Sequence, residues 1–75
     1  MNKLRLHTVS PVSCRVLINS GLHIGNLKLI GGVWKFKAIG YDADGHVIPG
    51  GGPLTDMHNT IFETLDDERI SQILT

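Results

Sequence analysis

VWKFKAIGY, residues 33–41, alternates as a β-strand does and is the clearest strand pattern in the chain. Successive side chains of a strand point to opposite faces of the sheet. Trp34, Phe36 and Ala38 therefore share one face. Lys35 and Lys37 lie on the other face, together with the apolar residues Val33, Ile39 and Tyr41. We expect the aromatic face to be buried under the rest of the chain and the lysine face to meet water.

Three further strand patterns precede this stretch. They cover residues 3–9, 13–19 and 22–30, and the turn residues Ser10–Pro11, Asn19–Gly21 and Gly31–Gly32 separate them. In the first pattern, the basic side chains alternate with the apolar ones. In the third, the apolar positions change parity at Gly25–Asn26, which predicts a β-bulge there. A meander of antiparallel strands follows from these patterns.

A hairpin is predicted directly after the central strand. Asp42-Ala43-Asp44-Gly45 stands between two strand-like segments, and glycine accepts the positive φ that a primed hairpin turn requires. The returning strand would be His46–Ile48, which Pro49 ends.

The segment that precedes the final helix can be interpreted either as a helix or as a strand. Apolar residues at helical spacing favour a helix from about residue 55 to 65, whereas Asn59–Phe62 has poor helix propensity and would serve well as a strand. A helix over about 66–74 is predicted more firmly, because Asp66, Asp67 and Glu68 suit the positive end of its dipole. Thr64 to Asp67 resembles a capping box that would begin it.

These patterns predict a single α+β domain over residues 1–75. Its centre is an antiparallel four- to five-stranded β-meander, packed on one face by one or two C-terminal helices. A chain of 75 residues with 41% hydrophobic residues folds around a small core, and its one cysteine permits no internal disulfide. Small unstapled domains often self-associate, so we expect a protein partner or a homodimer.

Charge is distributed unevenly along the chain, although the formal net charge is zero. Six of the seven lysines and arginines lie before residue 38, where no acid occurs, and all seven acids lie after it. Such asymmetry is typical of proteins that bind nucleic acid or an acidic partner. In the alternative interpretation, the two halves fold together and their charges neutralise each other locally.

Motifs for catalysis or for metal binding are weak. Gly50-Gly51-Gly52 lacks the lysine and hydroxyl of a phosphate-binding loop, so it is interpreted as a flexible or partner-contacting connector rather than a weak anion site. Asp42–Gly45 resembles the start of a calcium loop but lacks its later ligands. A metal site from His46, His58 and Asp44 would need the fold to gather them. Cys14 lies among apolar residues, which favours burial over reactivity. We expect no cofactor, no metal and no enzymatic activity.

Function is therefore expected to be non-catalytic binding. The chain contains neither the apolar run of a signal peptide nor a membrane span, which favours a cytoplasmic protein. We expect a small interaction module, and the alternative is a nucleic-acid-binding protein that uses a basic sheet face. The candidate partner-binding residues are Arg15, Lys28, Lys35 and Lys37. An ordinary solvated face, with lysines that prevent edge-to-edge aggregation, would explain the same residues.

Overall fold

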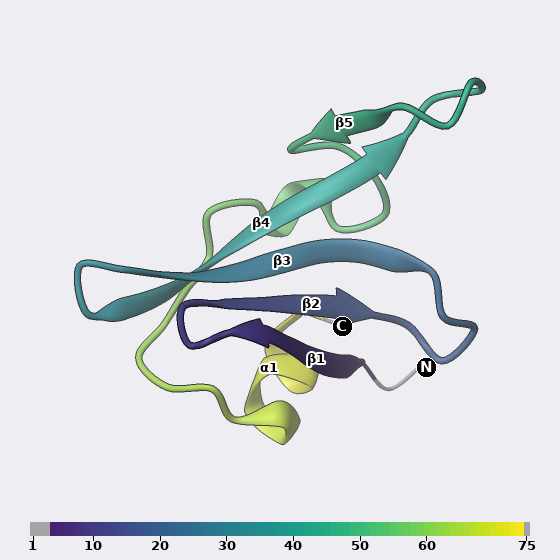
Figure 1. Ribbon diagram of the computed structural model, residues 1–75. Coiled ribbons are helices and arrows are strands. Elements are labelled where there is room, and N and C mark those ends of the chain that lie inside the picture. The colour runs from purple at the N-terminus through teal and green to yellow at the C-terminus, as the bar shows by residue number, and fades with distance from the viewer. Residues whose placement is uncertain (1–3, 75) are drawn as a thin grey trace.

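The computed structural model describes residues 4–74 as an antiparallel meander with an α-helix at its C-terminal end (Figure 1). The meander has five strands in sequence order, namely β1 (Arg5–Ser10), β2 (Ser13–Leu17), β3 (His23–Ile30), β4 (Val33–Tyr41) and β5 (Val47–Pro49). A 3-10 turn, η1 (Thr55–Met57), and a short strand, β6 (Ile61–Phe62), lead to the helix α1 (Asp67–Leu74). The predicted α+β fold, a meander with a C-terminal helix, is confirmed.

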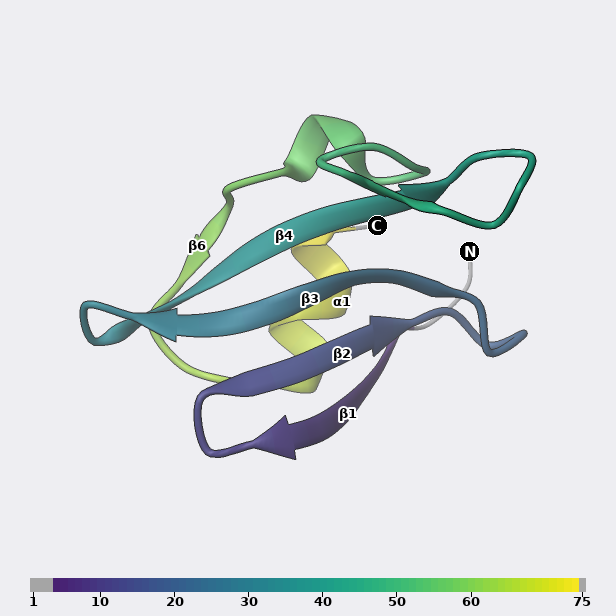
Figure 2. The ribbon, with the colours of Figure 1, turned by 45° about the horizontal axis from the view of Figure 1, so that its top comes forward.

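The core lies between the sheet and α1. Phe36 and Ala38 of β4 are fully buried, and Trp34 packs at the margin of the same cluster. Ile70 and Leu74 of α1 join this cluster, so the helix covers the aromatic face of β4, as Figure 2 shows. Burial of one such side chain contributes about 1.5–3 kcal/mol. We call this side of the sheet the core face and the opposite side the outer face.

Gly25 makes room for the largest buried ring. It lies opposite Ala38 on β3, and a Cβ atom at Gly25 would lie 2.5 Å from Cζ of Phe36 and 2.9 Å from the carbonyl oxygen of Lys37. The predicted bulge at Gly25–Asn26 is wrong by one position. Val16 of β2 pairs with Gly25 and Leu17 pairs with His23, so Ile24 is the extra residue. A bulge puts two neighbours on one side of the strand, and both Ile24 and Gly25 are buried.

The edge of β4 that faces away from β3 is hydrogen-bonded along its length. β6 pairs with its first residues and β5 with its last. Between them, the backbone of Asn59 donates to the carbonyl of Phe36 at 2.7 Å, and the amide of Phe36 donates to the carbonyl of Thr60 at 2.8 Å. The amide of Ala38 donates to Nδ1 of His58 at 3.0 Å. An imidazole thus takes the place of a strand partner.

This pairing explains why the predicted helix over residues 55–65 is wrong. Only the single 3-10 turn Thr55–Met57 forms, and Asn59 then adopts a positive φ of 74°. A continuous helix would use its own carbonyls and leave the β4 edge without partners, so the strand alternative holds for Ile61–Phe62.

The start of α1 also differs from its predicted capping box. Oδ1 of Asp66 accepts a hydrogen bond from the amide of Arg69 at 3.2 Å, and the backbone carbonyl of Asp66 accepts from Ile70 at 2.9 Å. Asp66 is therefore the N-cap, and Thr64 is not. The final helix itself is confirmed over Asp67–Leu74.

The hairpin between β4 and β5 is confirmed, but its turn is not of a primed type. A type I′ turn needs two central residues with positive φ, and in residues 42–46 only Gly45 has one, at 83°. Asp42 and His46 close the loop with a backbone hydrogen bond, and the amide of Gly45 donates to the carbonyl of Asp42. This pattern fits the longer loop that ends in a left-handed glycine.

Candidate functional site: the basic outer face of the sheet

Strand register brings the predicted basic residues onto one surface. His7 lies opposite Arg15, Arg15 opposite Asn26, and Asn26 opposite Lys37, in one row across four strands. Directly opposed residues of neighbouring strands share a face. The row therefore lies on the outer face, away from α1. Alternation in the sequence shows which residues share a side of one strand. The register between strands, which only the structure shows, aligns residues of four strands in one row.

A second row runs beside the first. Ser13 lies opposite Lys28 and Lys28 opposite Lys35, two residues along the strands from Arg15 and Lys37. All four predicted residues, Arg15, Lys28, Lys35 and Lys37, thus lie on the outer face. We call them, together with Arg5 and His7, the basic face. Strands about 4.8 Å apart that rise about 3.3 Å per residue spread these groups over roughly 14 by 13 Å.

Arg5 and His7 were not predicted as part of this surface. They alternate with Leu4 and Leu6, so the sequence carried the signal that they share a side of their strand. What it lacked was the pairing of β1 with β2, which places Arg5 opposite Leu17 and His7 opposite Arg15. Lys3, the remaining basic residue of this half, lies outside the described residues.

The basic face makes no direct ion pair with the acids of the described residues. Across residues 4–74, no lysine or arginine side chain makes an ion pair with a carboxylate. Lys37 instead donates from Nζ to Oδ1 of Asn59 at 2.6 Å. Glu63, Asp66, Asp67 and Glu68 lie at or beside α1, which covers the core face. The two halves of the chain therefore form no direct ion pairs between lysine or arginine and carboxylate side chains within the described residues, and neutralisation over a longer range stays an alternative interpretation.

One exposed aromatic side chain, Tyr41, lies at one end of the outer face. Tyr41 lies opposite Val47 at the end of β4 and is 43% exposed. Its hydroxyl lies 3.4 Å from Nδ1 of His23, whose Nε2 contacts Oδ1 of Asn26 at 2.8 Å. Asn26 belongs to the first row of the basic face, so polar contacts connect that row to the exposed tyrosine ring.

The glycine run after β5 packs backbone against backbone. Gly52 has a φ of 83°, and a Cβ there would lie 2.8 Å from the carbonyl carbon of Ile39. A Cβ at Gly40 would lie 2.6 Å from the amide nitrogen of Gly52. The segment needs glycine because its backbone packs directly against the backbone of β4, where a side chain would clash. This packing accounts for the glycine run, and no phosphate-binding role is needed to explain it.

The set His46, His58 and Asp44, which the sequence does not favour as a metal site, is not gathered among the described residues. His58 lies on the β4 edge, whereas Asp42, Asp44 and His46 lie together in the exposed hairpin, with one potential ligand atom of each within 4.8 Å of the others. Oδ1 of Asp42 already accepts the amides of Asp44 and His46, each at 2.9 Å. Nδ1 of His46 lies 3.5 Å from Oδ2 of Asp42. These bonds shape the turn, and a hairpin explains the cluster.

Cys14 is buried at 1% exposure in the core cluster, as its neighbours predicted. Desolvation by burial raises the pKa of its thiol, the backbone hydrogen bond with His7 lowers that pKa in part, and the charge of Asp67 raises it further. A protonated, enclosed thiol is a poor nucleophile.

Within residues 4–74, no helix is long and apolar enough to cross a lipid bilayer. Comparison of the chain with protein-family models, with curated proteins and with solved structures gives no match. A functional assignment therefore depends on the geometry and charge of the outer face.

Proposed function

We propose that this protein is a small non-catalytic binding module that holds a nucleic-acid strand on the basic face. The observation that carries the proposal is the gathering of Arg5, Arg15, Lys28, Lys35 and Lys37 on one face without carboxylate partners. Each cation that meets a phosphate releases condensed counterions, which favours binding.

The layout favours a strand over an isolated anion. Four of the cations lie in two rows, Arg15 with Lys37 and Lys28 with Lys35, and Arg5 lies beyond the first row on β1, so a chain of phosphates can contact several of them in succession. Tyr41 adds an exposed ring at one end of this surface. Every nucleobase has a face that stacks on an aromatic ring, so binding of this kind tolerates different sequences.

Binding without catalysis is supported by the state of the reactive side chains. Cys14 is enclosed in the core, His58 accepts a backbone hydrogen bond, and the hairpin cluster around Asp42 is exposed. General acid–base or nucleophilic catalysis needs a positioned pair of groups in a site that excludes water.

Fluorescence anisotropy with labelled oligonucleotides tests the proposal. Strands of about 12 nucleotides, single or duplex, cover a surface of this size. If the five cations each meet one phosphate, the logarithm of the association constant should fall against the logarithm of salt concentration with a slope of about −3.5 for a single strand. Affinity should then drop roughly 100-fold between about 50 and 200 mM salt.

Two charge reversals make a matched pair. Arg15→Glu changes the centre of the basic face, whereas Arg69→Glu changes an exposed arginine of α1, the helix that packs on the core face. Both variants alter the net charge equally. We expect Arg15→Glu to weaken binding at least tenfold and Arg69→Glu to leave it within about threefold. Equal losses, or no binding of the wild-type protein at low salt, would refute the proposal.

Self-association is a second candidate, because the basic face and the acidic surroundings of α1 are complementary in charge. Copies could stack with the outer face of one against Asp67 and Glu68 of the next. Such a head-to-tail contact does not close on itself unless it forms a ring. Sedimentation at about 50 and 500 mM salt tests it, since screening should dissociate the assembly. A monomer mass at both salt concentrations contradicts self-association.

A further inference from the structure

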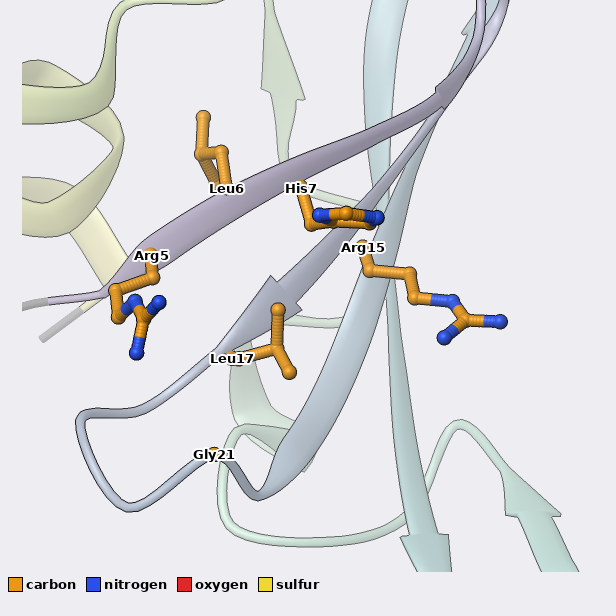
Figure 3. A pocket seen from close by; sticks show the side chains of 6 residues that line it. All are labelled: Arg5, Leu6, His7, Arg15, Leu17 and Gly21. Carbon is orange, nitrogen blue, oxygen red and sulfur yellow. The ribbon is translucent and has the colours of Figure 1, made fainter.

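A hollow of about 350 Å³ opens on the outer face at the corner formed by β1, β2 and the turn that follows β2. It is lined by Arg5, Leu6, His7, Arg15, Leu17 and Gly21 (Figure 3). Its volume lies within the range of about 300–1,000 Å³ that small-molecule sites occupy. The hollow is thus large enough for an anionic group together with part of the molecule that carries it.

Register explains why these side chains surround one space. Arg5 lies opposite Leu17 and His7 opposite Arg15 on the β1–β2 pair. In Figure 3, Leu17 stands between the two arginine side chains, His7 lies beside Arg15, and Leu6 points the other way. Leu6 packs against the core cluster, so its strand forms part of the wall while its side chain faces inward.

The turn that closes the hollow is held in shape by its own backbone. The amide of Gly21 donates to the carbonyl of Ile18 at 2.8 Å, and the amide of Ile18 donates to the carbonyl of Leu22 at 3.0 Å. Gly21 has a φ of 90°, and a Cβ there would meet no atom within 4 Å, so the space beside it is open. The shape of the wall on this side therefore depends on hydrogen bonds within the turn and not on contacts with a ligand.

The chemistry of the lining selects an anion. Arg5, His7 and Arg15 line the hollow, its lining contains no carboxylate, and neither arginine is engaged in an ion pair within the described residues. In Figure 3 the two guanidinium groups lie on opposite sides of Leu17 and point away from each other, so both must turn inward to meet one ligand. Guanidinium groups bind phosphate oxygens in pairs of parallel hydrogen bonds. No existing ion pair has to break for them to do so.

We propose that this hollow binds a phosphomonoester, either the terminal phosphate of a nucleic-acid strand or the phosphate of a free mononucleotide. A monoester carries about −1.5 to −2 charges near neutral pH, whereas a phosphodiester within a strand carries one. Two arginines in one hollow match the more highly charged group. Leu17 supplies apolar contact for the sugar or base attached to it.

The strand-end form of this proposal rests on the proposed function, because the hollow lies at one corner of the basic face. A strand that runs along the row from Lys37 to His7 reaches the hollow at the β1 side. Its end then lies beside Arg5. The mononucleotide form needs only the hollow itself.

Three oligonucleotides of one sequence test the site, phosphorylated at the 5′ end, at the 3′ end or at neither. We expect one phosphorylated strand to bind about tenfold more tightly than the strand without a terminal phosphate. Arg5→Gln should abolish that preference. Lys28→Gln, which removes the same charge from the basic face outside the hollow, should weaken all three strands and leave the preference intact.

Titration of the ¹⁵N-labelled protein with adenosine monophosphate and with inorganic phosphate separates the two sources of the phosphate. Amide shifts confined to β1, β2 and residues 18–22 support the site even if no oligonucleotide binds, in which case the proposed function alone fails. Equal binding of all three strands, with equal effects of Arg5→Gln and Lys28→Gln and no such amide shifts, refutes the site and leaves the proposed function standing.

Discussion

Replacement of Gly25 by alanine should destabilise the protein, although glycine is normally the weaker residue within a strand. The added Cβ would lie 2.5 Å from Cζ of Phe36, and the ring of Phe36 is fully buried. Carbon atoms in contact normally lie about 3.5–4.0 Å apart, so the overlap is about 1 Å. Because the ring of Phe36 is enclosed on all sides, it cannot relieve this overlap by moving towards solvent and must displace neighbouring core side chains.

Two opposing terms set the magnitude. Alanine in place of glycine within a strand gains roughly 0.5–1 kcal/mol from the reduced freedom of the unfolded chain. Overpacking of a filled core costs about 1–3 kcal/mol, and a rigid aromatic ring places this site at the upper end. We expect a net loss of about 2 kcal/mol in the free energy of unfolding. For a domain of this size, that loss lowers Tm by roughly 8–16 °C.

Urea denaturation followed by the fluorescence of Trp34, the single tryptophan, measures this loss. Phe36→Leu removes the ring that the new methyl group would strike. The double variant Gly25→Ala with Phe36→Leu should therefore be more stable than the sum of the two single changes predicts, by about 1 kcal/mol. Strict additivity, or a Gly25→Ala variant as stable as the wild type, would refute the packing of Gly25 against Phe36.

The same experiment bears on the candidate site. If Gly25 faces Phe36 on the core face, its neighbour Asn26 must face outward, next to Arg15 and Lys37. Failure of the packing prediction would therefore also remove the geometric basis of the basic face.

Three further predictions concern single side chains. Because burial raises the pKa of the Cys14 thiol, the free energy of unfolding should fall as the pH rises above about 8.5, the ordinary thiol value, and Cys14→Ala should lose this added dependence in urea titrations at several pH values. His58→Ala leaves the amide of Ala38 without its acceptor, so stability should drop by about 1–2 kcal/mol and hydrogen exchange at Ala38 should accelerate. His46→Ala, in the exposed hairpin, should change stability by less than about 0.5 kcal/mol, and equal effects of the two histidine changes would contradict the role given to His58. Asp66→Ala should lower stability by about 1 kcal/mol in thermal unfolding, whereas Asp66→Asn, which keeps a capping oxygen, should retain most of it.

Local chemistry was enough to predict the strands, the final helix and the sides of the central strand. Alternation in residues 33–41 separates Trp34 and Phe36 from Lys35 and Lys37, and the structure buries Phe36 fully while the lysines lie on the outer face. The burial of Cys14 followed from its apolar neighbours in the same way. These features depend on the period of a strand, which a sequence displays directly.

The region between β5 and α1 could not be predicted because distant backbone groups decide it. Apolar spacing favoured a helix over residues 55–65, yet the free edge of β4 needed hydrogen-bond partners. His58, Asn59 and Thr60 supply them, which breaks the helical pattern. The sequence around residues 55–65 does not show that the amide of Ala38, some 20 residues earlier, needs an acceptor.

The sequence by itself determined which side chains share a side of each strand, because alternation is a property of neighbouring residues. It also determined that six of the seven lysines and arginines precede all of the acidic residues. Only the tertiary structure decided that Arg5, Arg15, Lys28 and Lys37 form one surface, and that a hollow opens between Arg5 and Arg15. Register is set by turns, by the bulge at Ile24 and by the space that Gly25 leaves for Phe36, and these act between residues far apart in the chain.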